Sequence, residues 1–223
     1  MQTPKVFELT GVENYQKIVD EHPFATLIHS VNEGDSISAD AQHIPFYWHC
    51  DKDGNHYLHG HIARANTLWQ HSLASPTALC VFQGPQAYIT PNWYPTKQQH
   101  GKAVPTWNYV VVHIRGTVSF IHDKGWLESM LVTLTEKMEN NIEKGQKTVW
   151  QLSDAPQEYI QKMLAGIVGL EIAIESIEAQ CKLSQNQPAV NHEGVIQGLQ
   201  KSSQIGAAPM VKIMQLNKIE SAD

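Results

Sequence analysis

The chain has 223 residues, a mass of 25.0 kDa and a formal net charge of −6. The acidic balance argues against a broad nucleic-acid-binding surface, and no apolar run approaches the ~18 residues that a membrane-spanning helix needs. The three cysteines lack C-x-x-C spacing, and the N-terminus lacks a basic region followed by an apolar stretch. Both features indicate a reducing compartment, so we expect a cytoplasmic protein.

The first half of the chain is predicted to be rich in strands. Apolar residues at helical spacing predict an opening helix over 12–20. Polar turns then separate the segments of a strand meander, which we expect at 24–29, 42–49 and 56–60. A helix is expected over 63–75. A near-continuous apolar run predicts a buried strand over 77–83, which Gly84-Pro85 ends before a hairpin partner at 87–90.

The second half mixes strands with helices. Alternation over 109–121 is the strongest strand signal in the chain, and one face carries Val110, Val112, Ile114, Val118 and Phe120. Helices are predicted over 126–139 and 156–166, and a further strand over 168–174. Strands that follow one another without crossover helices pair antiparallel. The pattern therefore predicts an α+β, mainly antiparallel barrel in one domain over 1–200, with a C-terminal extension over 201–223.

A candidate phosphate site lies where a predicted strand passes through Gly60 into a predicted helix. The N–H groups at a helix N-terminus and the Arg64 guanidinium are donors that suit a phosphomonoester. The alternative is structural, with Gly60 in a tight turn and Arg64 an exposed helix residue. This motif alone does not decide between the two.

Two further motifs are rich in aromatic residues flanked by proline and asparagine, at 83–94 and 104–109. Such side chains can stack on a planar ring while amides read its heteroatoms, which would suit a flavin. The alternative is a proline-rich loop that packs against the barrel or a partner subunit. The density of aromatic residues between 88 and 109 favours a binding site. The polar loop 97–103 joins the two motifs, and we assign it no role.

The last motif, residues 180–186, offers an ammonium, a hydroxyl and amides after a predicted strand, and on its chemistry alone it is a solvated turn. The histidines raise the question of a metal, but His59 and His61 share a strand face while His56 lies on the other. No H-E-x-x-H or C-x-x-C completes a ligand set, so we predict no metal. Hydrolase, P-loop and Rossmann motifs are also missing from the sequence.

Taken in order along the chain, four segments resemble the PaiB-like family, the FMN-binding negative transcriptional regulators: Gly60–Asn66, Phe82–Tyr94, Val104–Tyr109 and Lys182–Asn186. The likeness extends from about Phe7 to about Leu199. It implies a split-barrel flavin-binding fold related to pyridoxamine 5′-phosphate oxidases and flavin reductases. It also implies a homodimer that holds FMN between its subunits.

The resemblance further implies a set of cofactor contacts. Arg64, with the backbone of Ala63 and Ala65 and with Gly60 and Asn66 beside it, would hold the FMN phosphate. His61 would lie near the ribityl chain or the ring. The isoalloxazine edge would be lined by His43, Ile44 and Pro45. The rest of the pocket, partly contributed by the second subunit, would come from Trp93, Thr106, Trp107, Asn108, Lys182, Ser184 and Gln185.

Three functions stay open on this basis. An FMN-dependent redox or regulatory protein comes first, because bound flavin carries the electrons itself and no side chain need act as an acid or base. A DNA-binding repressor comes second. The sequence has no recognisable helix-turn-helix, and its net charge of −6 disfavours binding to DNA. A haem-binding or haem-degrading protein comes third, with His43, His61 or His113 as an axial ligand.

Overall fold

The computed structural model describes residues 4–33, 35–70, 76–142 and 149–217. Within them, eight strands form an antiparallel sheet in the order β3-β2-β6-β7-β8-β5-β4, with β1 paired to β8. Three long strands, β6 (Thr77–Ile89), β7 (Thr106–Ile121) and β8 (Ile167–Lys182), contribute residues to both of the compact units into which the chain divides. The fold class is therefore α+β and mainly antiparallel, as predicted.

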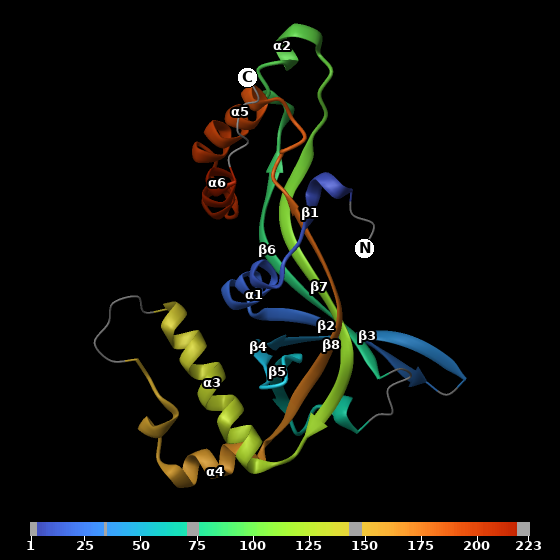
Figure 1. Ribbon diagram of the computed structural model, residues 1–223, viewed down its shortest axis with the longest axis vertical. Coiled ribbons are helices and arrows are strands. Elements are labelled where there is room, and N and C mark those ends of the chain that lie inside the picture. Colours follow the sequence, from blue (N-terminus) through green and yellow to red (C-terminus); the bar gives the residue numbers. More distant parts are fainter. Residues whose placement is uncertain (1–3, 34, 71–75, 143–148, 218–223) are drawn as a thin grey trace. The chain divides into compact units, whose positions relative to one another are not determined.

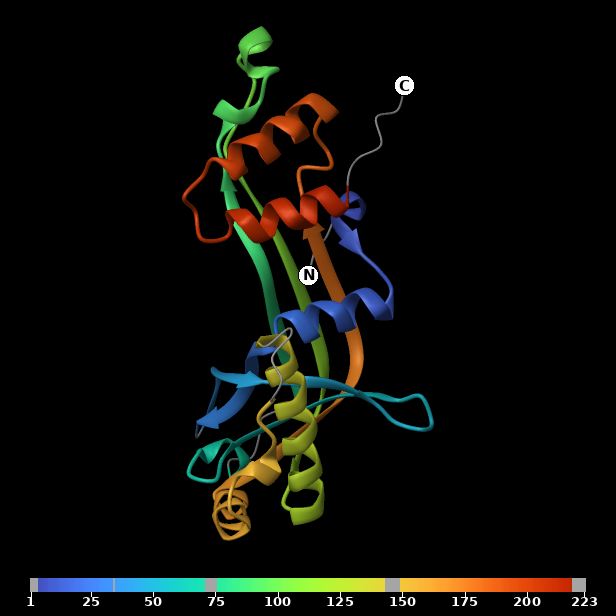
Figure 2. The same cartoon turned by 90° about the vertical axis from the view of Figure 1, so that its left-hand side faces the viewer.

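Unit 2 (Val12–Phe82 and Val112–Ile177) contains the meander. Its strands are β2 (Phe24–Glu33), β3 (Ser36–Pro45), β4 (Tyr47–Cys50) and β5 (His56–Ala63), and its helices are α1 (Val12–Glu21), α3 (Lys124–Ile142) and α4 (Gln157–Ala165). Figures 1 and 2 show α3 and α4 side by side. Both helices pack on Tyr47 through a buried apolar cluster, and α3 also contacts β5. This packing fixes the β4–β5 hairpin under α3.

Unit 1 (Met1–Gly11, Gln83–Val111 and Glu178–Asp223) holds the remaining elements. They are η1 (Lys5–Phe7), β1 (Glu8–Leu9), η3 (Pro91–Trp93), α2 (Lys97–His100), α5 (Ala189–Gln200) and α6 (Ala207–Leu216), while the short 3-10 helices η2 (Thr67–Trp69) and η4 (Leu152–Asp154) belong to unit 2. Helices α5 and α6 lie against each other, and α6 buries Ala207, Met210, Val211 and Met214. Residues 207–216, which we expected to lie in a C-terminal extension, thus form a packed helix.

Several expected elements are confirmed and several boundaries were wrong. The expected helix over 63–75 is replaced by a turn at Arg64–Ala65 and a short 3-10 helix, η2 (Thr67–Trp69), while residues 71–75 lie outside the described part of the chain. Strand β5 does not stop at Gly60 but continues to Ala63. Strand β8 runs on past residue 174 to Lys182.

Gly84-Pro85 does not end the strand that begins at Thr77, because β6 continues to Ile89. Strand β2 pairs with β6 over Leu79–Val81, so Pro85 lies past the point where β2 takes its hydrogen bonds. At Gly84, an added Cβ would come within 3.1 Å of the Val110 Cβ on β7. The glycine therefore serves a close approach of two strands.

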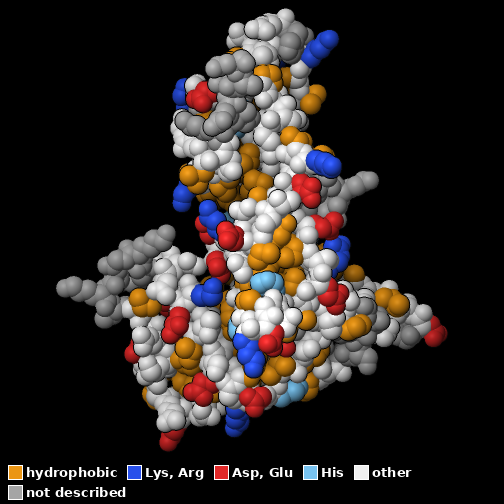
Figure 3. Space-filling model, viewed as in Figure 1, with side chains coloured by type: hydrophobic (Ala, Val, Ile, Leu, Met, Phe, Trp, Pro, Cys, Tyr) orange, Lys and Arg blue, Asp and Glu red, His pale blue; other side chains and the backbone are white. Residues whose placement is uncertain are grey.

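Surface charge is mixed on the face shown in Figure 3, where Lys and Arg side chains alternate with Asp and Glu. No helix among the described residues is both long and apolar enough to cross a membrane. The expectation of a cytoplasmic protein stays a prediction.

Candidate functional site

The Arg64 side chain is held firmly at the end of β5. Its Nε donates to the carbonyl of Ala165 and its Nη2 to that of Ile167, each at 2.8 Å, and the Arg64 backbone N–H donates to Gly166. Nη1 lies 3.5 Å from His122 Nδ1. The α4–β8 junction thus fixes the guanidinium with part of its five N–H donors used.

The Arg64 turn lacks the helix that the sequence predicted. A three-residue 3-10 helix follows it, so there is no helix N-terminus of useful length and no aligned helix dipole. Any anion site here would depend on the guanidinium and on nearby backbone groups. The turn itself is well ordered by hydrogen bonds, since Trp69 Nε1 donates to the Arg64 carbonyl at 2.8 Å.

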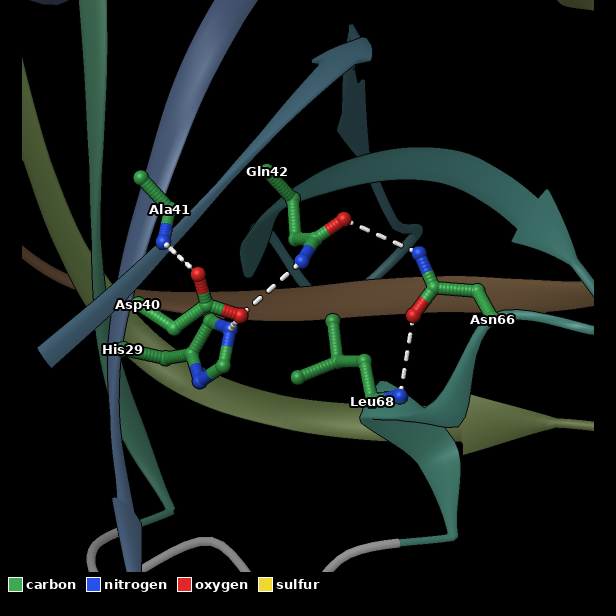
Figure 4. Close-up of polar contacts among 6 residues, drawn as sticks. All are labelled: His29, Asp40, Ala41, Gln42, Asn66 and Leu68. Atoms are coloured by element: carbon green, nitrogen blue, oxygen red, sulfur yellow. Dashed lines mark hydrogen bonds and ion pairs between the residues drawn. The ribbon is translucent and has the colours of Figure 1, made fainter. Parts of the chain in front are cut away.

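Asn66 connects this turn to strand β3, as Figure 4 shows. Its Nδ2 donates to Gln42 Oε1 at 2.9 Å, and its Oδ1 accepts from the Leu68 N–H. Gln42 in turn donates to Asp40, whose other oxygen accepts from the Ala41 N–H. Asn66 therefore acts as a structural link in this chain of contacts.

The remaining predicted residues of unit 2 lie on β3 and β5. Ile44 is buried, His43 is exposed and Pro45 is half-buried. At Gly60, an added Cβ would come within 2.8 Å of both the Phe46 ring and the Pro45 carbonyl oxygen. Only glycine lets β5 approach this segment so closely.

His61 lies opposite Gly169 in the β5–β8 register. Burial lowers its pKa, and its Nδ1 is buried without a hydrogen-bond partner among the described residues. The neutral ring therefore keeps one unused polar atom.

Five of the predicted residues of unit 1 are grouped around the end of β8. Lys182 Nζ donates to Thr106 Oγ1 at 2.7 Å, and Ser184 Oγ donates to Asn108 Oδ1 at 3.1 Å. Gln185 locks the turn, since its Oε1 accepts from Leu183 N and its Nε2 donates to the Cys181 carbonyl, both at 2.6 Å. Hydrogen bonds therefore join the segments 104–109 and 182–186, and their role in binding a cofactor stays a prediction.

Lys182, Thr106 and Ser184 line a cavity of about 650 Å³ that lies within unit 1. Sequence reasoning missed most of the residues around it. The full lining is Tyr94, Thr96, Gly101, Lys102, Ala103, Val104, Thr106, Lys182, Ser184, Asn186, Gln187, Pro188 and Asn191. Part of this lining comes from the 97–103 loop, to which we assigned no role.

The other predicted residues of unit 1 do not line that cavity. Asn108 is fully buried and its Nδ2 contacts the Met214 sulfur at 3.6 Å. Trp93 packs on α5, where a Cβ added at Gly194 or Gly198 would collide with it. Trp107 is about half exposed, at 51%, and makes an edge contact with Tyr88.

A hydrogen-bonded chain that the sequence did not reveal lies under α3 in unit 2. Tyr47 contacts His59 Nδ1 at 3.1 Å, and His59 Nε2 contacts Glu171 Oε2 at 3.0 Å. The His49 ring stacks on His59 with centroids 4.6 Å apart, and Trp126 lies 5.0 Å away. The partners are adjacent because the register pairs His59 with Tyr47 on one side and with Glu171 on the other.

Burial is the main cause of the pKa shifts of Tyr47, His59 and Glu171. His59 is only 5% exposed, and burial, helped by His49, lowers its pKa to about 4. Burial also raises the pKa values of Tyr47 and Glu171. The contacts assign His59 as the neutral tautomer that accepts from Tyr47 at Nδ1 and donates from Nε2 to Glu171.

His29 is a second buried histidine of unit 2. It lies 3.7 Å from Asp40 (Figure 4), and neither ring nitrogen has a hydrogen bond among the described residues. Burial lowers its pKa. Beside it is a hollow of about 250 Å³ that Arg115 also lines. In the described ranges no three His, Cys, Asp or Glu side chains converge as metal ligands.

The chain belongs to the family described as "Putative FMN-binding domain", whose model matches residues 1–176. Among its relatives is "Protease synthase and sporulation protein PAI 2" of Bacillus subtilis, with 34% identity over 96% of this chain and 97% of that protein. An uncharacterized protein of Saccharomyces cerevisiae is 35% identical over 66% of this chain and 95% of its own length. The family resemblance seen in the sequence is thereby confirmed.

Solved structures extend the comparison to the fold. The flavocytochrome Anf3 of Azotobacter vinelandii aligns with a TM-score of 0.53 at 10% identity, covering 82% of this chain and 72% of that one. An FAD- and heme-binding protein of Mycobacterium smegmatis aligns with a TM-score of 0.50 at 15% identity, covering 78% and 73%. At such identities the likeness shows the fold alone, and it agrees with the predicted split barrel.

Proposed function

We propose that this protein binds FMN and works as a flavin-dependent redox protein, with the FMN phosphate at the Arg64 turn. The observation that carries the proposal is the guanidinium itself, which two backbone carbonyls hold in place before any ligand arrives. A fixed guanidinium costs less entropy on binding than a free one. Membership in the family described as "Putative FMN-binding domain" supports FMN as the ligand.

The donor set at this turn suits a phosphate, although it is smaller than the sequence suggested. The N–H groups of Arg64 that its carbonyl partners leave unused would make charge-assisted bonds to phosphate oxygens, aided by the backbone of Ala63 and Ala65. Ala63 and Ala65 are exposed, which leaves room for the phosphate beside them. Without a helix dipole, Arg64 would provide most of the binding energy.

The ring would lie along the β3 edge and β5. His43, Ile44 and Pro45 would line its edge, and His61, Gly60 and Asn66 would surround the chain that joins ring to phosphate. Bound FMN would supply one- and two-electron chemistry. The protein's own part is to bind, orient and shield it, and the half-buried His61 offers its Nδ1, which has no hydrogen-bond partner within the described part of the chain.

The experiment compares FMN with riboflavin, which lacks the phosphate. Arg64→Ala should weaken FMN binding about thirtyfold, the equivalent of ~2 kcal/mol, and leave riboflavin binding nearly unchanged. Lys52→Ala, which removes an exposed cation of the same unit, serves as the control. Visible absorption of wild type with FMN and with haemin separates flavin from haem binding.

Arg64 also has a structural role, which the same variants measure. Loss of its bonds to Ala165 and Ile167 should lower the melting temperature of the apoprotein, whereas lost phosphate contacts appear only in FMN affinity. If Arg64→Ala destabilised the apoprotein while wild type and variant, both folded, bound FMN equally, the phosphate assignment would be wrong.

A further inference from the structure

The cavity of unit 1 has features that the proposed FMN contacts at Arg64 do not explain. Its volume of about 650 Å³ lies within the range of small-molecule sites. Six of its 13 lining residues come from 182–191, beyond residues 1–176 that the family model matches. All of its lining residues belong to a single unit.

The charged side chains that line the cavity are all positive. Lys102 and Lys182 are both part of it, and none of the lining residues is Asp or Glu. In the described part of the chain, the Lys182 ammonium contacts a hydroxyl, Thr106 Oγ1, and lies 5.6 Å above the Phe7 ring, and no carboxylate pairs with it. An ammonium without a carboxylate partner at the wall of a cavity attracts an anion.

The N-terminus of helix α5 adds to the positive electrostatic potential in the cavity. The helix begins at Ala189 after Pro188, a lining residue, and runs for 12 residues with no acidic side chain in its first turn. No side chain of that first turn therefore offsets the partial positive charge at the helix N-terminus. Asn191, 3% exposed, holds the helix start to Thr96 through a hydrogen bond between Nδ2 and Oγ1 at 2.9 Å.

One residue of the cavity wall, Ser184, has a strained backbone conformation. Ser184 has φ of +62°, the only non-glycine residue of the described chain with a positive φ. Such a conformation is strained and persists only where neighbouring contacts enforce it. Here the side chains of Asn108 and Gln185 do so, at Ser184 Oγ and at the Leu183 N–H. The turn that carries Lys182 is thus rigid before a ligand binds.

We propose that this cavity binds the anionic group, a phosphate or a carboxylate, of a small organic molecule, at a site separate from that of the FMN phosphate. Lys182 and the N-terminus of α5 would hold the anion. The amides of Asn186 and Gln187 would contact the polar remainder of the molecule. The proposal does not depend on FMN binding at Arg64, since every group that it uses lies in unit 1.

The test is a residue-resolved NMR titration of the protein with pyrophosphate and, separately, with malonate, at constant ionic strength. We expect saturable shifts of the amides of residues 182–191 with at least one probe, and the stronger probe identifies the anion class. Lys182→Met should weaken that binding roughly tenfold, Lys182→Arg should retain it, and Lys212→Met, an exposed cation on α6, should leave it unchanged.

Two results would overturn the proposal. One is the absence of saturable shifts at these amides with either probe in the folded wild type. The other is FMN itself shifting the same amides and displacing the probe, which would make the cavity part of the flavin site. Failure of FMN to bind at Arg64 would leave the pyrophosphate and malonate titrations unaffected, so the two proposals fail separately.

Discussion

Acid should destabilise this protein through His59, well before the ordinary carboxylates titrate. The folded state holds this ring neutral, between the Tyr47 hydroxyl and the Glu171 carboxylate. Its pKa is about 4 in the fold against 6.5 for a free histidine. In an unfolded chain the same ring takes up a proton below pH 6.5. The unfolded state therefore binds more protons between these values, and stability falls as pH falls.

The magnitude follows from the two pKa values. At pH 7.5 both states are unprotonated at His59, so its contribution to the pH dependence is close to zero. At pH 5 the unfolded ring is almost fully protonated and the folded ring is about one-tenth protonated, which gives a loss of about 2 kcal/mol. Glu171 acts in the opposite direction, because burial raises its pKa and protonation at low pH relieves that penalty.

Urea unfolding of the apoprotein at pH 7.5 and pH 5 measures this loss. His59→Gln keeps an acceptor for Tyr47 and a donor for Glu171 but cannot titrate, so its loss between the two pH values should be about 2 kcal/mol smaller than that of wild type. His43→Gln, at an exposed position of β3, is the matched control and should behave as wild type does. Equal pH dependence of His59→Gln and wild type would refute the reasoning, because Glu171 is present in both.

Two further predictions concern partners. We expect a homodimer, because a flavin held between subunits needs both barrels in place; light scattering that gave a mass near 25 kDa with flavin bound would contradict this. We also expect no tight binding to duplex DNA. Lys137, the described member of the sequence's modest basic cluster, is paired with Asp20 at 2.9 Å, and Lys144 and Lys147 lie outside the described residues. A sequence-specific nanomolar gel shift at ~150 mM salt would restore the repressor hypothesis.

The sequence predicted best those elements whose hydrophobic period is unambiguous. Strand β7 buries Val110, Val112, Ile114 and Val118 on one face as expected, and α1 and α3 begin and end within a few residues of their predicted ranges. The helix over 63–75 failed because helical spacing of apolar residues does not decide structure where side chains take over the backbone's hydrogen bonds. Here Asn66 accepts from the Leu68 N–H, and the Trp69 indole donates to the Arg64 carbonyl.

Residues that act through strand register were out of reach from the sequence. The sequence pattern around Tyr47, His59 and Glu171 does not mark these residues as neighbours. Glu171 comes from a strand that lies more than a hundred residues after His59 in the chain. The same holds for the cavity of unit 1, where the 97–103 loop meets the start of α5 only through the fold. Local motifs do encode a candidate phosphate ligand such as Arg64. How many N–H groups of Arg64 are available to a phosphate depends on its long-range partners, here the carbonyls of Ala165 and Ile167. Binding experiments on Arg64 therefore have to be interpreted together with the stability of the apoprotein.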